Sequence, residues 1–152
     1  MTDITYLPYG GKTLYLSSIL DLYNGEIVAY SIADKQDTSF VLDTLNQLPL
    51  RSDMMLHSDQ GSVYTSQVYQ EAIKAKGITM SMSRKGTPAD NAPIESFHST
   101  LKSETFYLEG LTCTTTAIVE QTVRDYITYY NSIRIQTKLN NQSPINFRRL
   151  AA

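Results

Sequence analysis

The chain has little of what secreted, membrane-spanning or zinc-binding proteins need. Its 152 residues include a single cysteine, Cys113, so no disulfide can form within the chain and nothing indicates secretion. The two histidines, His57 and His98, have no Cys or His partners at the spacing of a zinc site. No apolar run approaches the roughly 20 residues that span a bilayer. The N-terminus lacks the basic and apolar regions of a signal peptide, so we expect no membrane partner.

Positive charge is scarce in the first part of the chain. Residues 1–60 hold three basic against eight acidic residues, a net charge of −5, and the remaining residues carry +3, which gives −2 overall. A protein that only grips DNA is usually basic overall. An acidic first part suits a carboxylate cluster that awaits divalent cations, but solvated surface carboxylates give the same count. Charge alone therefore favours solvated surface carboxylates over a metal-binding cluster.

Length and composition indicate a single globular domain that opens with three strands. Hydrophobic residues make up 41% and charged residues 18%, which is ordinary for a globular protein. The pattern predicts strands over 3–8, 13–20 and 26–32. Gly10-Gly11 forms the first turn, and Asn24-Gly25 is typical of a hairpin turn with two positive φ angles. Such short turns favour an antiparallel meander.

The rest of the chain alternates helices with short strands. Helices are predicted over 38–48, 67–76, 90–107 and 116–131, and strands over 54–57 and 78–82. The tail from Arg134 is polar and contains Pro144, so we predict turns there. The order predicts a mixed sheet flanked by helices, which is an α/β fold. The last helix has an apolar stripe that we interpret as core, made of Val119, Val123, Tyr126 and Tyr130.

Three carboxylates lie where such a fold could bring them together. Asp3 lies within the first strand, Asp59 follows the end of another, and Glu95 comes 36 positions later on a predicted helix. They converge only if the two strands are neighbours and the helix crosses their ends. Carboxylates select Mg²⁺ or Mn²⁺, and two such ions about 4 Å apart can activate an attacking oxygen and stabilise a leaving one. Taken singly, each is more often a turn residue or a solvated surface residue. Gly61 would allow close approach beside Asp59.

Basic and polar residues near Glu95 indicate a surface that could hold a phosphate backbone. His98, Ser99 and Lys102 follow Glu95 at i+3, i+4 and i+7, so the four share one helix face. Arg84 and Lys85 lie in a loop rich in helix breakers just before that helix. We therefore predict DNA contacts by Lys102, Arg84, Lys85, His98 and Ser99. An ordinary amphipathic helix would show the same face.

Other catalytic patterns are incomplete. A Ser-His-Asp hydrolase would need a nucleophile elbow, which is missing. Gly10-Gly11-Lys12-Thr13 fails as a phosphate loop because Tyr6 stands at the first glycine position. Tyr129-Tyr130 lacks the basic cluster that a tyrosine recombinase requires, and Cys113 lies among threonines with no nearby histidine.

Several stretches of the chain resemble one family. Residues 2–6 (TDITY), 57–64 (HSDQGSVY) and 90–104 (DNAPIESFHSTLKSE) resemble the DDE catalytic core of bacterial insertion-sequence transposases, which are related to retroviral integrases. Asp3, Asp59 and Glu95 match the DD(35)E positions, and Lys102 matches the basic residue after the Glu. Residues 129–134 (YYNSIR) and Ser143-Pro144 resemble the C-terminal signature, although Gln136 stands where many relatives have His.

The resemblance implies an RNase H-like fold with a five-stranded mixed sheet, the first three strands antiparallel, flanked by helices. It implies one domain over 1–152, with the RNase H-like core over about 1–110 and a C-terminal helix and tail over 111–152. The implied reaction is Mg²⁺-dependent cutting at transposon ends, followed by attack of the new 3′-OH on target DNA. Asp3 and Asp59 would hold one ion and Glu95 would complete the shell of a second, with Mn²⁺ as a substitute. The implied partners are DNA and further copies of the chain, in the bacterial cytoplasm.

The family also normally carries an N-terminal helix-turn-helix region, which we do not find. The chain starts two residues before Asp3, so we expect an isolated or truncated core. Two alternatives stay open. One is an inactive core that serves as a folding or dimerisation module, and the other is an RNase H-like nuclease that hydrolyses DNA without joining it.

Overall fold

The computed structural model describes residues 1–108 and 115–152, so Cys113 and the predicted division near residue 110 lie outside the described residues. The strands are β1 (Thr2–Tyr9), β2 (Lys12–Leu20), β3 (Ile27–Ala33), β4 (Met55–Ser58) and β5 (Thr79–Met82). The helices are α1 (Thr38–Leu45), α2 (Ser62–Thr65), α3 (Gln67–Ala75), α4 (Ala92–Glu104), α5 (Thr116–Ser132) and α6 (Pro144–Ala151), with short 3-10 turns η1 (Pro88–Asn91) and η2 (Thr137–Leu139).

The predicted antiparallel meander is confirmed for β1, β2 and β3. Gly10 and Gly11 both have positive φ, at 46° and 74°, which is the conformation that a two-residue hairpin turn requires. The Asn24-Gly25 turn differs from the prediction, because only Gly25 has positive φ. Asn24 is instead buried, and its Nδ2 donates hydrogen bonds to Glu26 Oε2 and to the carbonyl of Pro144. This side chain therefore ties the β2–β3 turn to the start of α6.

The five predicted strands are present, but their hydrogen bonds form two sheets. β1, β2 and β3 make one, and β4 and β5 form a parallel pair in register over Met55–Ser58 and Thr79–Met82. Among the described residues, β1 contacts β4 without a backbone ladder between them. The single five-stranded sheet is corrected to this pair of adjoining sheets, because no ladder of backbone hydrogen bonds joins β1 to β4 in the described part of the chain. The α/β class and the antiparallel arrangement are confirmed.

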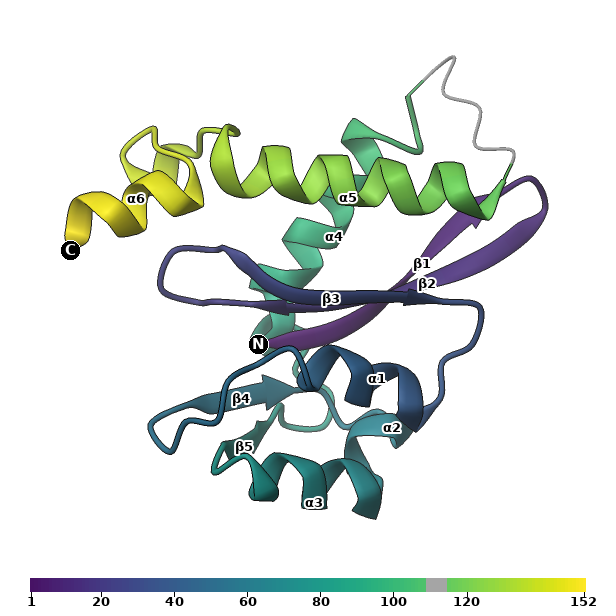
Figure 1. The fold of residues 1–152 in the computed structure, drawn as a ribbon, viewed down its shortest axis with the longest axis vertical. Coiled ribbons are helices and arrows are strands. Elements are labelled where there is room, and N and C mark those ends of the chain that lie inside the picture. The colour runs from purple at the N-terminus through teal and green to yellow at the C-terminus, as the bar shows by residue number, and fades with distance from the viewer. Residues whose placement is uncertain (109–114) are drawn as a thin grey trace.

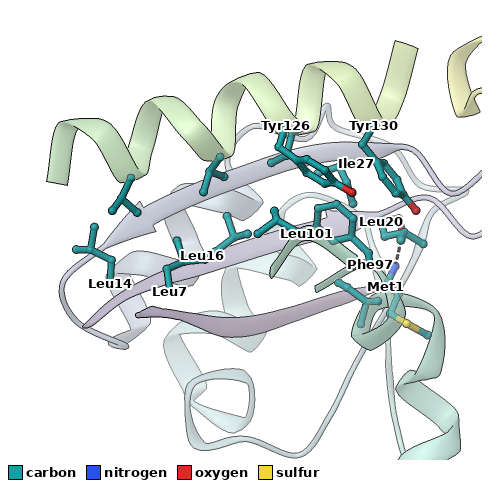
Figure 2. Packing of buried hydrophobic residues seen from close by; sticks show 14 residues of the cluster. Met1, Leu7, Leu14, Leu16, Leu20, Ile27, Phe97, Leu101, Tyr126 and Tyr130 are labelled. Atoms are coloured by element: carbon teal, nitrogen blue, oxygen red, sulfur yellow. Dashed lines mark hydrogen bonds between the residues drawn. The ribbon is translucent and has the colours of Figure 1, made fainter. Parts of the chain in front are cut away.

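Helices cover both faces of the three-stranded sheet. Figure 1 shows α4 and α5 on one face, with α1, α3 and the β4–β5 pair on the other. Alternate residues of β2, among them Leu14 and Leu16, point toward α4 and α5, as the two-residue period of a strand requires. Figure 2 shows Leu14 and Leu16 beneath α5, in the same cluster of buried residues as Phe97, Leu101 and Tyr126. The apolar stripe predicted for α5 is confirmed as core, since Val119, Val123, Tyr126 and Tyr130 are all buried.

The C-terminal tail contains a helix that the sequence did not predict. Pro144 opens α6 at its first position, where the missing N–H costs nothing. Arg148 pairs with Glu26 at 2.7 Å, and the Pro144 carbonyl accepts a bond from Asn24, so contacts with the distant β2–β3 turn fix this helix. The predicted helix over 90–107 is shorter, because η1 precedes α4 and Asp90 accepts a bond from the Arg84 backbone N–H instead of capping the helix. None of the helices in the described parts of the chain could cross a bilayer.

Candidate active site

Three carboxylates from three separate elements act on one another. Asp3 lies in β1, Asp59 follows β4, and Glu95 lies in the first turn of α4. The pKa of Asp3 is raised to about 6, chiefly by burial and further by the negative charges of Asp59 and Glu95. The Ile4 backbone N–H opposes this shift. The fold thus brings the three predicted carboxylates within electrostatic reach, and it leaves a surplus of negative charge at Asp3.

Local backbone structure holds Asp59 in place. The Gly61 N–H donates a hydrogen bond to Oδ1 of Asp59 at 2.8 Å. A Cβ at position 61 would lie 2.9 Å from the same oxygen, so the position has no room for a side chain while Asp59 keeps this rotamer. Tyr64 lies buried next to this segment in α2, and burial raises the pKa of its hydroxyl well above the usual range, with the charges of Asp3 and Asp59 adding to the effect.

The chemistry of the three carboxylates fits a hard divalent cation. All the donors are oxygens, and a cation would relieve the repulsion that raises the pKa of Asp3. In residues 1–108 and 115–152, no three His, Cys, Asp or Glu side chains stand close enough together to form a complete metal site. Mg²⁺ usually takes only one or two protein carboxylates and keeps several waters. The residues present are therefore suited to such an ion, with the remaining positions left for water and substrate oxygens.

His98 lies inside the protein, against the prediction that it contacts DNA. Its side chain on α4 is buried, with Nε2 2.7 Å from Ser18 Oγ and Nδ1 3.9 Å from Asp3 Oδ2. Burial, and secondarily the charge of Lys102, lowers the pKa of His98 to about 3, so the imidazole is neutral. The prediction of a DNA contact is wrong for His98, because α4 presses this side of the helix against the sheet.

Lys102 lies on α4, and its side chain reaches across to β1. Its Nζ donates a hydrogen bond to Thr5 Oγ1 at 3.0 Å and lies 4.1 Å from the centre of the Tyr6 ring. The aromatic ring attracts the ammonium group through its negative face. The other predicted DNA-contact residues, Arg84, Lys85 and Ser99, have exposed side chains. Arg84 makes a long ion pair of 3.6 Å with Asp90.

The residues of the C-terminal signature hold the fold together. Arg134 forms a two-pronged bond with Glu104 at the end of α4, with nitrogen–oxygen distances of 2.8 to 3.0 Å, and Tyr126 also donates to Glu104. Asn131 accepts from the Ile27 N–H and donates to the Ile27 carbonyl, each at 2.9 Å. These contacts connect α5 to α4 and to β3, so they place the helix that carries Glu95.

Sequence reasoning missed Ser18, Thr5 and Tyr64 as neighbours of the carboxylates. Strand period offers a signal for Ser18, because it has the same parity as the core residues Leu14 and Leu16. No local pattern could show that Asp3 lies opposite Ser18, since that depends on the register between β1 and β2. His57 lies in β4, with its Nδ1 2.9 Å from Ser81 Oγ of β5.

Comparison with protein families and known sequences gives consistent results. Two family models, both described as integrase core domain, match residues 1–88 and 95–150. The chain is 41% identical over 152 residues to the putative transposase InsK of insertion sequence element IS150 from Escherichia coli, covering 97% of this chain and 53% of that protein. It is also 41% identical to an uncharacterized transposase-like protein of Haemophilus influenzae, covering 97% of this chain and 68% of that protein. The chain thus spans about half to two thirds of the length of these relatives.

Solved structures with the same fold include retroviral integrases. The catalytic core domain of the HTLV-2 integrase, in complex with magnesium, superposes with a TM-score of 0.74 at 15% identity, over 96% of this chain and 92% of that one. A chain in the intasome of simian T-cell lymphotropic virus gives a TM-score of 0.79 at 16% identity, over 96% of this chain and 52% of that one. This likeness confirms the RNase H-like fold.

Proposed function

Because the chain belongs to the integrase core domain family of insertion-sequence transposases, we propose that it carries out metal-dependent phosphoryl transfer on DNA. The proposed reaction cuts transposon ends to leave a 3′-OH and then joins that 3′-OH to target DNA. The observation that carries the proposal is that Asp3 in β1 lies where the negative charges of Asp59, after β4, and Glu95, in α4, both reach it.

Each of the three carboxylates would have its own part in binding the divalent cations. Asp3 and Asp59 would hold one divalent ion between them, and Glu95 would complete the shell of a second. Bound Mg²⁺ or Mn²⁺ would supply charge that activates the attacking oxygen and stabilises the leaving one. The protein itself would hold the carboxylates in place. The Gly61 N–H binds the Asp59 carboxylate, and the register between β1 and β2 sets the position of Asp3. Little covalent chemistry is left for the protein, as in other phosphoryl transfers.

Basic residues around the carboxylates would hold the DNA backbone. Lys102, held by Thr5 and Tyr6, keeps its ammonium group next to β1, where a phosphate beside Asp3 could accept a hydrogen bond from it. Arg84 and Lys85 stand exposed before α4, and Ser99 is exposed on α4 itself. Such contacts position DNA without reading its sequence.

Assembly and location belong to the same proposal. Structures of the HTLV-2 integrase core are described in dimeric and trimeric forms. We therefore include a homodimer or higher multimer as the working form of this chain, acting on DNA in the bacterial cytoplasm.

A strand-joining assay tests the proposal. The chain is incubated with a labelled oligonucleotide bearing a free 3′-OH, supercoiled plasmid and Mg²⁺ or Mn²⁺, and the products are separated under denaturing conditions. We expect metal-dependent joined products from the unsubstituted chain and none from Asp59→Asn or Glu95→Gln. Asp53→Asn is the matched control, because Asp53 is an exposed carboxylate paired with Arg51 and should leave joining unchanged.

Each alternative predicts a different result in this assay. Nicked plasmid without any joined product would favour an RNase H-like nuclease. No product with either ion, from a chain that is folded by circular dichroism, would favour an inactive core. Unfolding of both Asp59→Asn and Glu95→Gln would contradict the catalytic assignment, because removing one of several like charges should not destabilise the fold.

A further inference from the structure

Asp3 and Ser18 are directly opposite each other in the ladder between β1 and β2. Side chains of such a pair project from the same face of the sheet, with their Cβ atoms about 5 Å apart. That face is the one covered by α4, and His98 of α4 lies over the pair, with Nε2 2.7 Å from Ser18 Oγ and Nδ1 3.9 Å from Asp3 Oδ2. His98 also follows Glu95 by one helical turn. One buried imidazole therefore connects both strands to the helix that carries another carboxylate of the site.

The order Ser18, His98, Asp3 resembles that of a hydrolase triad, but burial excludes this use. Ser18 is 0% exposed and His98 is 4% exposed, so no substrate can reach the serine hydroxyl. Asp3 alone reaches the surface, with 21% of its side chain exposed. The series of polar side chains therefore begins at buried Ser18, passes through buried His98 and ends at Asp3 on the surface. Asp3 is thus the residue whose carboxylate His98 can orient.

We propose that His98 is a positioning residue that orients the Asp3 carboxylate, with Ser18 fixing the imidazole from the other side; this inference rests on the proposed function. The Ser18 hydroxyl can donate to Nε2, which leaves the ring proton on Nδ1 and directs it at Asp3. The 3.9 Å separation exceeds hydrogen-bond length, and a shift of about 1 Å by the carboxylate closes it. Asp3 then has a hydrogen-bond donor on its protein side, while 21% of its side chain stays exposed.

Mn²⁺ binding to the chain without DNA tests this role. Affinity is measured by titration calorimetry or by the loss of the free Mn²⁺ paramagnetic resonance signal, alongside thermal unfolding of each variant. His98→Phe fills a similar space without polar atoms, and we expect it to weaken Mn²⁺ binding about 10- to 100-fold, as is typical when a residue that orients a metal ligand is lost. His98→Gln supplies a donor again and should recover most of the affinity. Ser96→Ala, at an exposed position on the same helix, is the matched control and should change nothing.

The outcomes separate this inference from the proposed function. Equal Mn²⁺ affinity of the unsubstituted chain and His98→Phe would overturn the positioning role alone. No Mn²⁺ binding by the unsubstituted chain would overturn both. If His98→Phe fails to fold, Ser18→Ala decides, since it removes one buried oxygen: weaker binding by a folded Ser18→Ala supports the role, and unchanged binding contradicts it.

Discussion

The backbone N–H of Gly61 donates a hydrogen bond to Oδ1 of Asp59 at 2.8 Å, and a Cβ on Gly61 would lie 2.9 Å from that same oxygen. Gly61 thus binds the Asp59 carboxylate through its N–H, and because it has no Cβ it does not clash with that carboxylate. The φ angle of Gly61 is −58°, which any residue can adopt, so the glycine is required by the space around Asp59 and not by backbone strain.

This relationship predicts the effect of Gly61→Ala. The added methyl group should displace the Asp59 carboxylate while the backbone stays as it is, so we expect Mn²⁺ affinity and strand joining to fall at least about tenfold. The change in unfolding free energy should stay within about 1 kcal/mol. Calorimetric titration with Mn²⁺ and urea unfolding measure the two quantities. Ser62→Ala, at the exposed neighbouring position, is the control, and full Mn²⁺ affinity in Gly61→Ala would refute the idea.

The raised pKa of Asp3 predicts that stability depends on pH. The pKa of Asp3 is about 6 in the folded chain against 3.8 for an ordinary Asp, so the folded state binds the proton more tightly. Ionisation of Asp3 should therefore subtract on the order of 2–3 kcal/mol from the stability of the metal-free chain as pH rises from about 4 through 6. His98 acts in the opposite direction over this range, because burial lowers its pKa to about 3, so the contribution of Asp3 is read from the comparison with Asp3→Asn. Asp3→Asn should remove that loss.

Urea unfolding in EDTA at pH 4 and pH 7.5 measures the effect. The stability of Asp3→Asn relative to the unsubstituted chain should increase between the two pH values. Asp53→Asn is the control for the direction of the change, because the ion pair with Arg51 lowers the pKa of Asp53. The stability of Asp53→Asn relative to the unsubstituted chain should therefore decrease between pH 4 and pH 7.5. A difference for Asp3→Asn that does not change with pH would contradict the account.

The bond between Arg134 and Glu104 predicts that lysine cannot replace arginine. Lysine keeps the charge but cannot make the two-pronged contact that joins the segment just after α5 to the end of α4. We expect Arg134→Lys to lower the free energy of unfolding by about 1–2 kcal/mol, as for bonds to charged groups. The control is Arg124→Lys, at an exposed position on α5, which should change it by less than about 0.5 kcal/mol. Equal stability of the two variants would show that Arg134 serves another purpose.

Replacing Asn131 should cost more stability than replacing Arg134. Asn131→Leu removes both bonds to the Ile27 backbone and leaves a buried N–H and carbonyl without partners, which should cost about 2–5 kcal/mol. Gln121→Leu, on the exposed side of the same helix, provides the comparison. Thermal or urea unfolding measures both, and a loss below about 1 kcal/mol for Asn131→Leu would mean that water or other groups replace the amide.

Whether a feature could be predicted from the sequence depends on how many positions along the chain separate the residues that form it. The Gly10-Gly11 turn and the apolar stripe of α5 are local patterns, and the structure has both. The helix α6 could not be predicted, because Asn24 and Glu26, more than 100 positions away, hold it. The same limit explains His98: helix period placed it beside Glu95, but only the packing of α4 on β1 and β2 decides which side of that face is buried.

The central claim is that Asp3 and Asp59 hold a divalent ion between them, with Glu95 nearby to complete the shell of a second. The most direct measurement is a crystal structure of the chain soaked in Mn²⁺, with anomalous difference maps that locate the ion. The account predicts Mn²⁺ between the carboxylates of Asp3 and Asp59, with Glu95 within reach of the same site. Mn²⁺ bound elsewhere, or a soaked crystal in which Asp3 points away from Asp59 and no ion lies between them, would contradict it.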